Sequence, residues 1–239
     1  MPNSYAIIPA AGLSTRMGST TSKQARKQWI EIAGVPIFIH TLRRFDQCGA
    51  IRAMVVPVRA EDRKRVEERI GAERFRAAVE IVEGGTARQD SVFNAVEHLA
   101  LVMKAAEDDL IAVHDAVRPF IEVETIERAL AAARAHGAAI VGVAAVDTVK
   151  QVERVSPDAN RVSATLPREK IVLAQTPQVF RLDLLRAAFA KARADGFYAT
   201  DEASLVEHFG HDVFVVPGSM RNWKITTPAD LELAARLLT

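Results

Sequence analysis

The chain has 239 residues, 49% of them hydrophobic and 26% charged, and its formal net charge is +1. This balance predicts a soluble globular protein with a sizeable core and leaves no basic footprint for nucleic acid. The longest apolar run, residues 138–146, is far below the ~18 residues of a membrane-spanning helix, and no basic segment of a signal peptide precedes the first apolar run. The single cysteine, Cys48, excludes an internal disulfide. We therefore expect a cytoplasmic protein with neither a nucleic acid nor a membrane as partner.

Short apolar runs, which predict buried strands, alternate with amphipathic segments, which predict helices. The predicted strands cover residues 5–8, 53–58, 79–82, 110–113, 138–146 and 213–216. The predicted helices cover residues 36–45, 61–70, 91–103, 124–136, 182–194, 203–209 and 228–238. Such alternation is typical of an α/β fold with a Rossmann-like, doubly wound, mostly parallel twisted sheet. We expect one domain over residues 1–239.

Residues 147–175 break this alternation. Two β-like pieces, residues 148–155 and 161–166, flank the turn-forming pentapeptide Ser-Pro-Asp-Ala-Asn at 156–160. The pattern predicts a projecting β-hairpin arm, and because a two-stranded arm is marginal alone, it needs a partner surface. An ordinary hairpin at the edge of the chain's own sheet is the alternative that the pattern leaves open.

The first predicted strand ends at Pro9, which cannot continue a hydrogen-bonded ladder. The turn that follows consists of three small residues, Ala10, Ala11 and Gly12. Their backbone is open to close approach, and consecutive free N–H groups in such a turn bind anions. Arg16 and Lys27 follow and could supply positive charge to phosphate oxygens. The stretch predicts a nucleotide-triphosphate loop, although it matches neither G-x-G-x-x-G nor the Gly-Lys-Ser/Thr of a P-loop.

Residues 84–91, Gly-Gly-Thr-Ala-Arg-Gln-Asp-Ser, connect a predicted strand to a predicted helix. Ligands of open α/β sheets bind at the carboxyl ends of strands, where this segment is expected to lie. Gly85 would permit a base or ribose to approach, and Ser91 would open the helix with its hydroxyl and free amides. A glycine turn followed by an N-cap serine accounts for the same residues without a ligand.

Residues 114–119, His-Asp-Ala-Val-Arg-Pro, follow another predicted strand. A carboxylate at a strand end that faces a triphosphate is a natural Mg²⁺ ligand, so Asp115 is the predicted metal ligand. Arg118 could pair with Asp115 or with phosphate, and a purely structural Asp–Arg salt bridge is the alternative. We expect His114 to orient neighbouring groups rather than to act as a catalyst.

Together these segments resemble the cytidylyltransferases that act on 2-C-methyl-D-erythritol 4-phosphate. The resemblance extends from residue 6 to about residue 232. Its motifs lie at residues 8–17 and 114–119, with Asp-Thr-x-Lys at 147–150, Thr-Pro-Gln-x-Phe at 176–180, Thr-Asp-Glu-Ala-Ser at 200–204 and Asn-x-Lys-x-Thr at 222–226.

The resemblance implies that CMP is transferred from CTP to the 4-phosphate of the polyol, with Mg²⁺ as cofactor, by a homodimer whose arm embraces the second subunit. The implied catalytic residues are Arg16, Lys27 and Lys224. The implied nucleotide-binding residues are Ala10, Ala11, Gly12, Gly85, Ser91 and Ala116. The implied substrate-binding residues are Asp115, Arg118, Thr148, Arg168, Thr176 and Thr200.

The chain departs from the family pattern at a few positions. Arg26 stands where a proline usually precedes the Lys-Gln pair, and residues 18–25 form a longer stretch than usual, so Lys23 competes with Lys27 as the loop lysine. Leu-Pro before Arg168 also differs from the commoner pattern. Because the sequence ends at residue 239, we expect no fused cyclase.

Two other functions stay open at this point. The first is a cytidylyltransferase for another polyol phosphate, such as ribitol 5-phosphate. The second is a non-catalytic, nucleotide-binding regulator, which the presence of Arg16, Lys27, Asp115 and Lys224 argues against.

Overall fold

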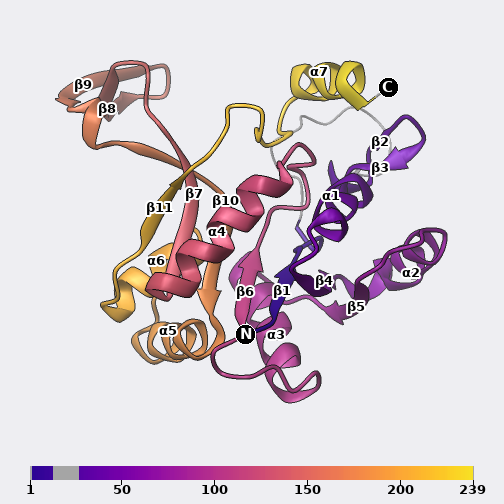
Figure 1. Ribbon diagram of the computed structural model, residues 1–239. Helices are drawn as coiled ribbons and strands as arrows, with labels where there is room; N and C mark the ends of the chain where they lie inside the picture. Colours follow the sequence, from indigo (N-terminus) through magenta and orange to yellow (C-terminus); the bar gives the residue numbers. More distant parts are fainter. Residues whose placement is uncertain (1, 13–26, 239) are drawn as a thin grey trace.

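A computed structural model of the chain describes residues 2–12, the backbone of Lys27, and residues 28–238. Figure 1 shows a central twisted sheet with helices on both sides and a two-stranded hairpin that stands apart from it. The sheet has seven strands in the order β11-β7-β10-β6-β1-β4-β5. They are β1 (Ser4–Ile7), β4 (Ile51–Val58), β5 (Ala78–Glu83), β6 (Leu110–Val113), β7 (Ala138–Ala144), β10 (Val172–Arg181) and β11 (Phe214–Pro217).

The order of the strands fixes where a ligand can bind. From β1 the chain adds β4 and β5 on one side, and β6 then pairs with β1 on the other side, so the winding reverses at β1. Neighbouring strands of this sheet run parallel except where β10 lies antiparallel between β6 and β7. This confirms the predicted doubly wound, mostly parallel sheet, and it places a crevice beyond the carboxyl ends of β1 and β6.

The helices form a layer on each face of the sheet. One layer holds α1 (Ile37–Gln47), α2 (Arg63–Gly71) and α4 (Val123–His136), and the other holds α3 (Arg88–Leu101), α5 (Leu182–Asp195) and α6 (Glu202–Phe209). Side chains of β1 alternate between the layers, because Ala6 packs with the first and Tyr5 and Ile7 with the second. This two-sided burial explains why the strands appear in the sequence as nearly continuous apolar runs. None of the described helices is long and apolar enough to cross a membrane.

A smaller hydrophobic cluster lies above the carboxyl ends of the strands. There α7 (Pro228–Leu238) packs beside the short strands β2 (Glu31–Ile32) and β3 (Val35–Pro36), which pair with each other. The predicted cap of this helix is present, since Thr227 Oγ1 accepts from Asp230 N at 3.2 Å and Asp230 Oδ2 accepts from Thr227 N at 2.8 Å. The α7 cluster therefore anchors the chain just after the segment that carries Lys224.

Strand β10 was not predicted from the sequence. Its centre reads Gln-Thr-Pro-Gln at 175–178, and a proline within a run argues against a central strand. The structure accommodates it with a register irregularity between Ala174 and Gln178 in the pairing with β7. Regular pairing resumes at the apolar end of the strand, where Val179 and Phe180 are fully buried. The polar middle of β10 therefore lies inside the fold, next to the crevice.

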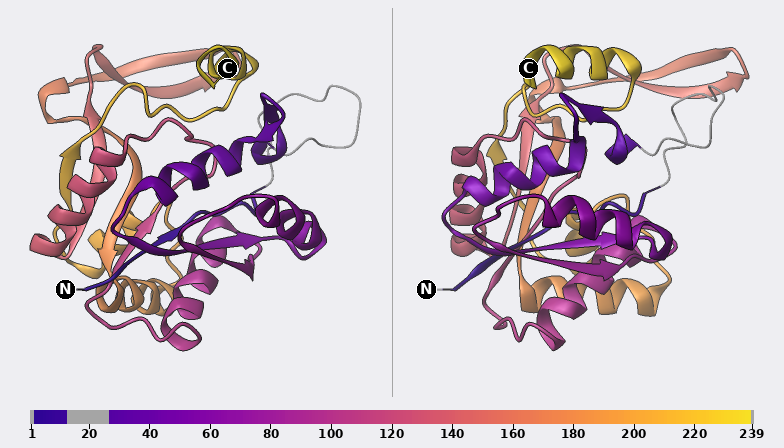
Figure 2. Two further views of the ribbon diagram at one scale, coloured as in Figure 1. Left: turned by 45° about the vertical axis from the view of Figure 1, so that its right-hand side comes forward. Right: turned by 90° about the vertical axis from the view of Figure 1, so that its right-hand side faces the viewer.

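The hairpin consists of β8 (Val149–Ser156) and β9 (Ala159–Leu166), which pair antiparallel as a separate sheet. Its turn is shorter than the predicted pentapeptide, because both strands continue into residues expected to turn. In both views of Figure 2 the hairpin extends from the upper part of the molecule, beyond the helical layers. It is followed by the short helix η3 (Arg168–Lys170) and then by β10.

Candidate functional site

A pocket of about 430 Å³ lies at the carboxyl ends of the strands, at the predicted crevice. Seven predicted site residues line it: Ala11, Gly12, Gly85, Ser91, Asp115, Ala116 and Lys224. They come from four segments of the chain, so the sheet topology brings together the motifs that the sequence keeps far apart. Ala10 is buried and does not line the pocket. Arg16, Lys23 and the Lys27 side chain lie outside the described residues.

Asp115 is the carboxylate at the centre of this pocket, and three cations surround it. Its Oδ2 lies 3.0 Å from Lys224 Nζ and 3.2 Å from Arg118 Nε, and its Oδ1 lies 3.7 Å from Arg88 Nε. Burial alone would raise the pKa of Asp115, but Lys224, Arg88 and Arg118 outweigh burial and hold that pKa well below its usual range. Asp115 is therefore ionised throughout the neutral range.

Lys224 reaches Asp115 because the 222–226 segment is fastened to the strand ends. Asn222 donates to the carbonyl of Thr176 at 2.8 Å, and its own carbonyl accepts from Arg118 Nη1 at 2.8 Å. The amide of Ile225 donates to Val117 O at 3.0 Å. Arg118 thus bridges Asp115 and the C-terminal segment, which answers the question whether it pairs with this carboxylate.

His114 and Thr176 form a hydrogen-bonded support below Asp115. His114 Nε2 lies 3.1 Å from Arg118 O, which can only accept, so the proton of the neutral ring is assigned to Nε2. His114 Nδ1 then accepts from Thr176 Oγ1 at 3.0 Å, and Thr176 Oγ1 accepts from Asp115 N at 3.1 Å. His114 is fully buried, and burial lowers its pKa to about 4. A neutral imidazole with both nitrogens engaged orients its neighbours, as the sequence led us to expect.

The 84–91 segment differs from its prediction in one respect. Helix α3 begins at Arg88, so Ser91 does not open the helix but lies inside its first turn. Its hydroxyl accepts from Gly85 N at 3.0 Å and donates to Ala87 O at 2.9 Å, while Asp90 Oδ2 accepts from Ala87 N at 3.1 Å. The proximity of a helix start was recognised correctly, but the capping side chain belongs to Asp90.

The glycines of this segment admit protein rather than ligand. A Cβ at Gly85 would lie 2.2 Å from Asp90 Cβ, and a Cβ at Gly84 would lie 2.6 Å from Ala11 Cβ. The loops after β1 and β5 therefore pack directly against each other. Gly85 still lines the pocket through its backbone.

Three residues that line or support the pocket were not predicted as site residues from the sequence. Gln28 donates through Nε2 to Ala10 O at 2.6 Å and to Gly12 O at 3.4 Å, so it joins the two ends of the stretch that carries Arg16. Arg88 lines the pocket and forms two bonds to Glu202, at 2.7 and 3.0 Å. Glu202 is buried, which raises the pKa of its carboxyl, whereas the Arg88 charge opposes that rise. All three stood inside quoted motifs, but side-chain partners are not readable from motifs alone.

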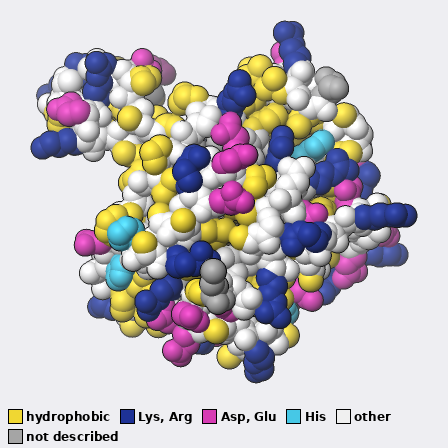
Figure 3. Space-filling model, in the orientation of Figure 1, with side chains coloured by type: hydrophobic (Ala, Val, Ile, Leu, Met, Phe, Trp, Pro, Cys, Tyr) yellow, Lys and Arg dark blue, Asp and Glu magenta, His cyan; other side chains and the backbone are white. Residues whose placement is uncertain are grey.

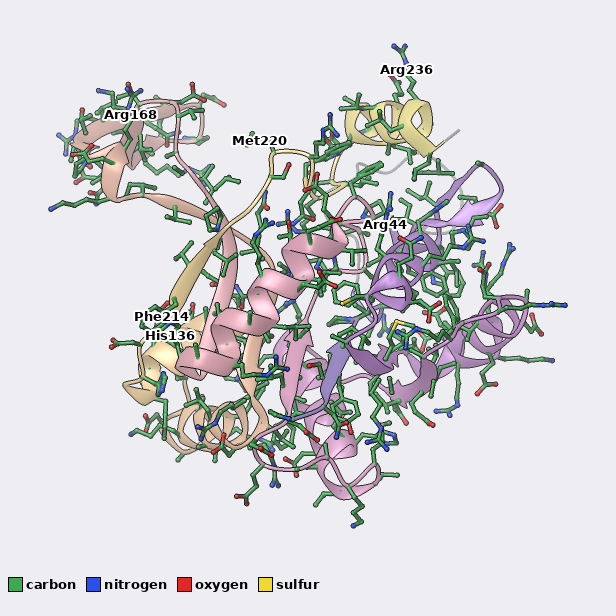
Figure 4. The ribbon with its side chains drawn as sticks, in the orientation of Figure 1. Arg44, His136, Arg168, Phe214, Met220 and Arg236 are labelled. Carbon is green, nitrogen blue, oxygen red and sulfur yellow. The ribbon has the colours of Figure 1, made fainter. Side chains whose placement is uncertain are left out.

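Of the six predicted substrate-binding residues, only Asp115 lines the pocket. Arg118 and Thr176 contact Asp115 without lining the pocket themselves. The remaining three, Thr148, Arg168 and Thr200, lie elsewhere. Thr148 and Arg168 belong to the base of the arm, where Arg168 Nη1 donates to Val146 O at 2.7 Å, and Thr200 precedes α6. All three are exposed. Figure 4 shows Arg168 at the arm, away from the body of the sheet. Within one chain, therefore, the pocket and these residues remain separate.

Neutral burial of His114 predicts a pH dependence of stability. The pKa of His114 rises from about 4 in the fold to about 6.5 on unfolding, so its contribution is complete above pH 6.5 and is lost as the pH falls toward 4. The free energy of unfolding should fall by about 3 kcal/mol over that range from this group. Urea unfolding of wild type and His114→Gln at several pH values measures it.

The His114→Gln variant should lack this part of the pH slope. The control is His136→Gln, which changes an exposed histidine and should keep the wild-type slope. Equal slopes for His114→Gln and wild type would contradict a neutral, buried His114.

Comparison with known proteins identifies the family. The sequence matches the profile of the family described as 2-C-methyl-D-erythritol 4-phosphate cytidylyltransferase over residues 4–239. Proteins of that name from Acidobacterium capsulatum and Solibacter usitatus are 53% and 52% identical, covering 97% and 95% of this chain and 95% and 92% of their own lengths. The crystal structure of 4-diphosphocytidyl-2C-methyl-D-erythritol synthase from Anaerococcus prevotii matches with a TM-score of 0.82 at 30% identity, covering 99% of this chain and 96% of that one. The chain belongs to the 2-C-methyl-D-erythritol 4-phosphate cytidylyltransferase family.

Proposed function

We propose that this chain transfers CMP from CTP to 2-C-methyl-D-erythritol 4-phosphate, giving 4-diphosphocytidyl-2-C-methyl-D-erythritol and pyrophosphate in isoprenoid precursor biosynthesis. This chain belongs to the family, and the observation that carries the proposal is its pocket. There Lys224, Arg118 and Arg88 surround Asp115 at the switch point of the sheet. A cationic wall of this kind suits two phosphorylated substrates that must approach each other despite like charge. Cys48, a buried free thiol, fits a cytoplasmic location, which stays a prediction.

The proposed chemistry needs no general base. The phosphate monoester attacks the α-phosphorus of CTP as a dianion, which is already nucleophilic, and the bond to pyrophosphate breaks. His114 is not suited to proton transfer, because both its ring nitrogens are engaged within the protein. Catalysis then rests on positioning and on stabilising the charge that develops at phosphorus.

Lys224 is the described residue best placed to stabilise this charge. Its side chain is 43% exposed and lines the pocket. Because the ammonium group is not buried, it can move from Asp115 to a phosphate oxygen without becoming an unpaired buried charge. We assign the same role to Arg16 and Lys27, on the strength of the family motif. Ala11, Gly12 and Ala116 would provide backbone contacts to the nucleotide.

We propose Mg²⁺ as the cofactor, with Asp115 as a ligand. Mg²⁺ is commonly held by one or two carboxylates together with substrate phosphates. Among the described residues that line the pocket, Asp115 is the one carboxylate. Lys224 and Arg118 contact its Oδ2, whereas Arg88 Nε lies 3.7 Å from its Oδ1. No group of three or more His, Cys, Asp or Glu side chains placed to hold a metal occurs among the described residues, so phosphates would complete the coordination. When bound, Mg²⁺ would neutralise charge on the triphosphate.

We further propose a homodimer formed through the arm. Val152, Val155 and Val162 of the hairpin are 51%, 65% and 55% exposed, and Val172 and Leu173 at the start of β10 are 42% and 52% exposed. Figure 3 shows hydrophobic side chains on the visible face between the hairpin and the rest of the molecule. Exposed apolar patches of this kind mark interfaces. A second copy could bring Thr148, Arg168 and Thr200 toward a pocket that they do not line within one chain.

Pyrophosphate release tests the activity. With CTP and Mg²⁺, turnover should be fastest with 2-C-methyl-D-erythritol 4-phosphate in a panel that includes ribitol 5-phosphate. CTP should exceed UTP by at least about tenfold in kcat/KM, because uracil leaves an acceptor of the site unpaired, which costs about 1–3 kcal/mol. Faster turnover of ribitol 5-phosphate would reassign the substrate, and CTP binding without turnover would favour a regulator.

Replacing Asp115 by Asn tests the metal ligand. A neutral amide is a weaker ligand for a hard cation, so the variant should need more Mg²⁺ for half-maximal rate. Titration of Mg²⁺ at saturating CTP measures this requirement. An unchanged Mg²⁺ requirement together with a lower unfolding midpoint would instead support a purely structural salt bridge to Arg118.

Changing the apolar face of the arm tests the dimer. Val152 and Val162 are direct cross-strand partners, so Val152→Lys with Val162→Glu keeps an attractive pair in the hairpin while removing the apolar surface. Sedimentation velocity should show weaker dimerisation of this double variant. The control exchanges the exposed ion pair Glu153–Arg161 by Glu153→Arg with Arg161→Glu and should remain dimeric. A monomeric wild-type chain at micromolar concentration would overturn the proposal.

A further inference from the structure

Glu202 is a buried carboxylate whose charge is matched by a residue of the pocket. It begins α6, its side chain is 1% exposed, and its Oε1 and Oε2 accept from Arg88 Nη1 and Nη2 at 2.7 and 3.0 Å. The cap of α6 does not need it, because Asp201 Oδ1 accepts from Ser204 N at 3.1 Å. Burying a carboxylate is costly, so a bidentate partner is the feature that makes its position tolerable.

Arg88 connects this buried carboxylate to Asp115. Its side chain is 32% exposed and lines the pocket, and its Nε lies 3.7 Å from Asp115 Oδ1. A bidentate pair fixes the plane of a guanidinium, so Glu202 determines the orientation of Arg88. Each η nitrogen keeps a second N–H that Glu202 does not use. Arg88 therefore presents oriented donors at the wall of the pocket.

The three cations around Asp115 approach it to different distances. Lys224 and Arg118 approach its carboxylate to 3.0 and 3.2 Å, whereas Arg88 stays at 3.7 Å. If the charge of Glu202 were absent, Asp115 would be the nearest carboxylate for Arg88. A full Arg88–Asp115 pair would form at Oδ1, whereas Lys224 and Arg118 contact Oδ2.

We propose that Glu202 is a positioning residue of this site: it holds Arg88 away from Asp115 and aims the guanidinium at a phosphate oxygen of a bound substrate. The inference rests on the proposed function, since it needs an anionic substrate in the pocket. The phosphate belongs either to CTP or to the polyol phosphate, and the two sources are separated by measuring KM for each substrate.

The test compares Glu202→Gln with Arg88→Lys. Both should lower kcat/KM about tenfold or more, because a donor near the reacting phosphates is no longer held in place. A rise in KM for CTP alone, or for the polyol phosphate alone, assigns the phosphate that Arg88 contacts. Arg88→Lys keeps a cation beside Glu202, so it should fold even where Glu202→Gln does not, and wild-type kinetics for Arg88→Lys would overturn the proposal.

A double-variant cycle separates positioning from simple stability. If Glu202 acts through Arg88, then Glu202→Gln should add little further loss of kcat/KM to Arg88→Gln. The matched control is Glu97→Gln, which breaks another bidentate pair of α3, to Arg186 at 2.8 and 3.2 Å. It should leave kcat/KM unchanged. Full kcat/KM for Glu202→Gln with only a lower unfolding midpoint would show that the pair is structural and overturn the proposal.

Direct binding distinguishes failure of this inference from failure of the proposed function. If wild type releases no pyrophosphate with any polyol phosphate tested, the proposed function fails. Calorimetric titration of wild type and Glu202→Gln with CTP and with 2-C-methyl-D-erythritol 4-phosphate still reports on Arg88. Weaker binding of one of these ligands by the variant supports positioning, and equal binding of both contradicts it.

Discussion

The ionised carboxylate of Asp115 places the strongest physical constraint on this molecule. It lies at a strand end with only 12% of its side chain exposed, and such a charge is tolerated only when cations and donors surround it. Arg118 comes from the same loop, Lys224 from the C-terminal segment and Arg88 from the start of α3. Arg88 and Arg118 are in turn held by Glu202 and by the carbonyl of Asn222, so the requirement of one side chain for partners accounts for much of the arrangement around the pocket.

The polar middle of β10 has its explanation in this constraint. An apolar strand between β6 and β7 would satisfy the core, yet Gln175, Thr176 and Gln178 are buried there. Thr176 supports Asp115 and His114, Gln175 accepts from Asn222, and Gln178 binds the loop before α6 through Asp201. Polar residues occupy these buried positions of β10 because their side chains hold three loops of the site in place by hydrogen bonds.

The periodicity of the sequence was enough to predict the layers of the fold. Six of the seven sheet strands and all the long helices were recognised, since two-sided burial makes strands such as β1 and β6 continuous apolar runs. Strand β10 could not be recognised, because its residues serve partners distant in sequence and carry no strand period. The same reason hid Glu202 and Gln28, since a buried polar side chain is explained only by its tertiary partner.

The sequence predicted which segments form the candidate pocket, but not the roles of individual atoms within it. Segments rich in glycine or charge at the ends of predicted strands were placed together correctly, because parallel strands share one carboxyl edge. The roles of single atoms were not accessible in this way. Ser91 was taken as the start of α3, whereas its hydroxyl closes the turn from inside the helix, and the glycine beside it makes room for Asp90. Such assignments depend on shifts of a few residues, which sequence patterns do not resolve.

Among the described residues the arm is a separate two-stranded sheet, so both of its strands are edge strands. On the outer side of each strand, backbone donors and acceptors are available to a further strand. Such edges can pair with other chains and so lead to aggregation. The valines at 152, 155 and 162 would favour such growth, but charged side chains are interspersed among them, including Lys150, Glu153, Arg154 and Arg161. Another arm stacking in register would bring like charges together. The charged side chains of the arm therefore disfavour fibre-like addition of further arms, while its exposed valines would still be able to pack against an apolar surface.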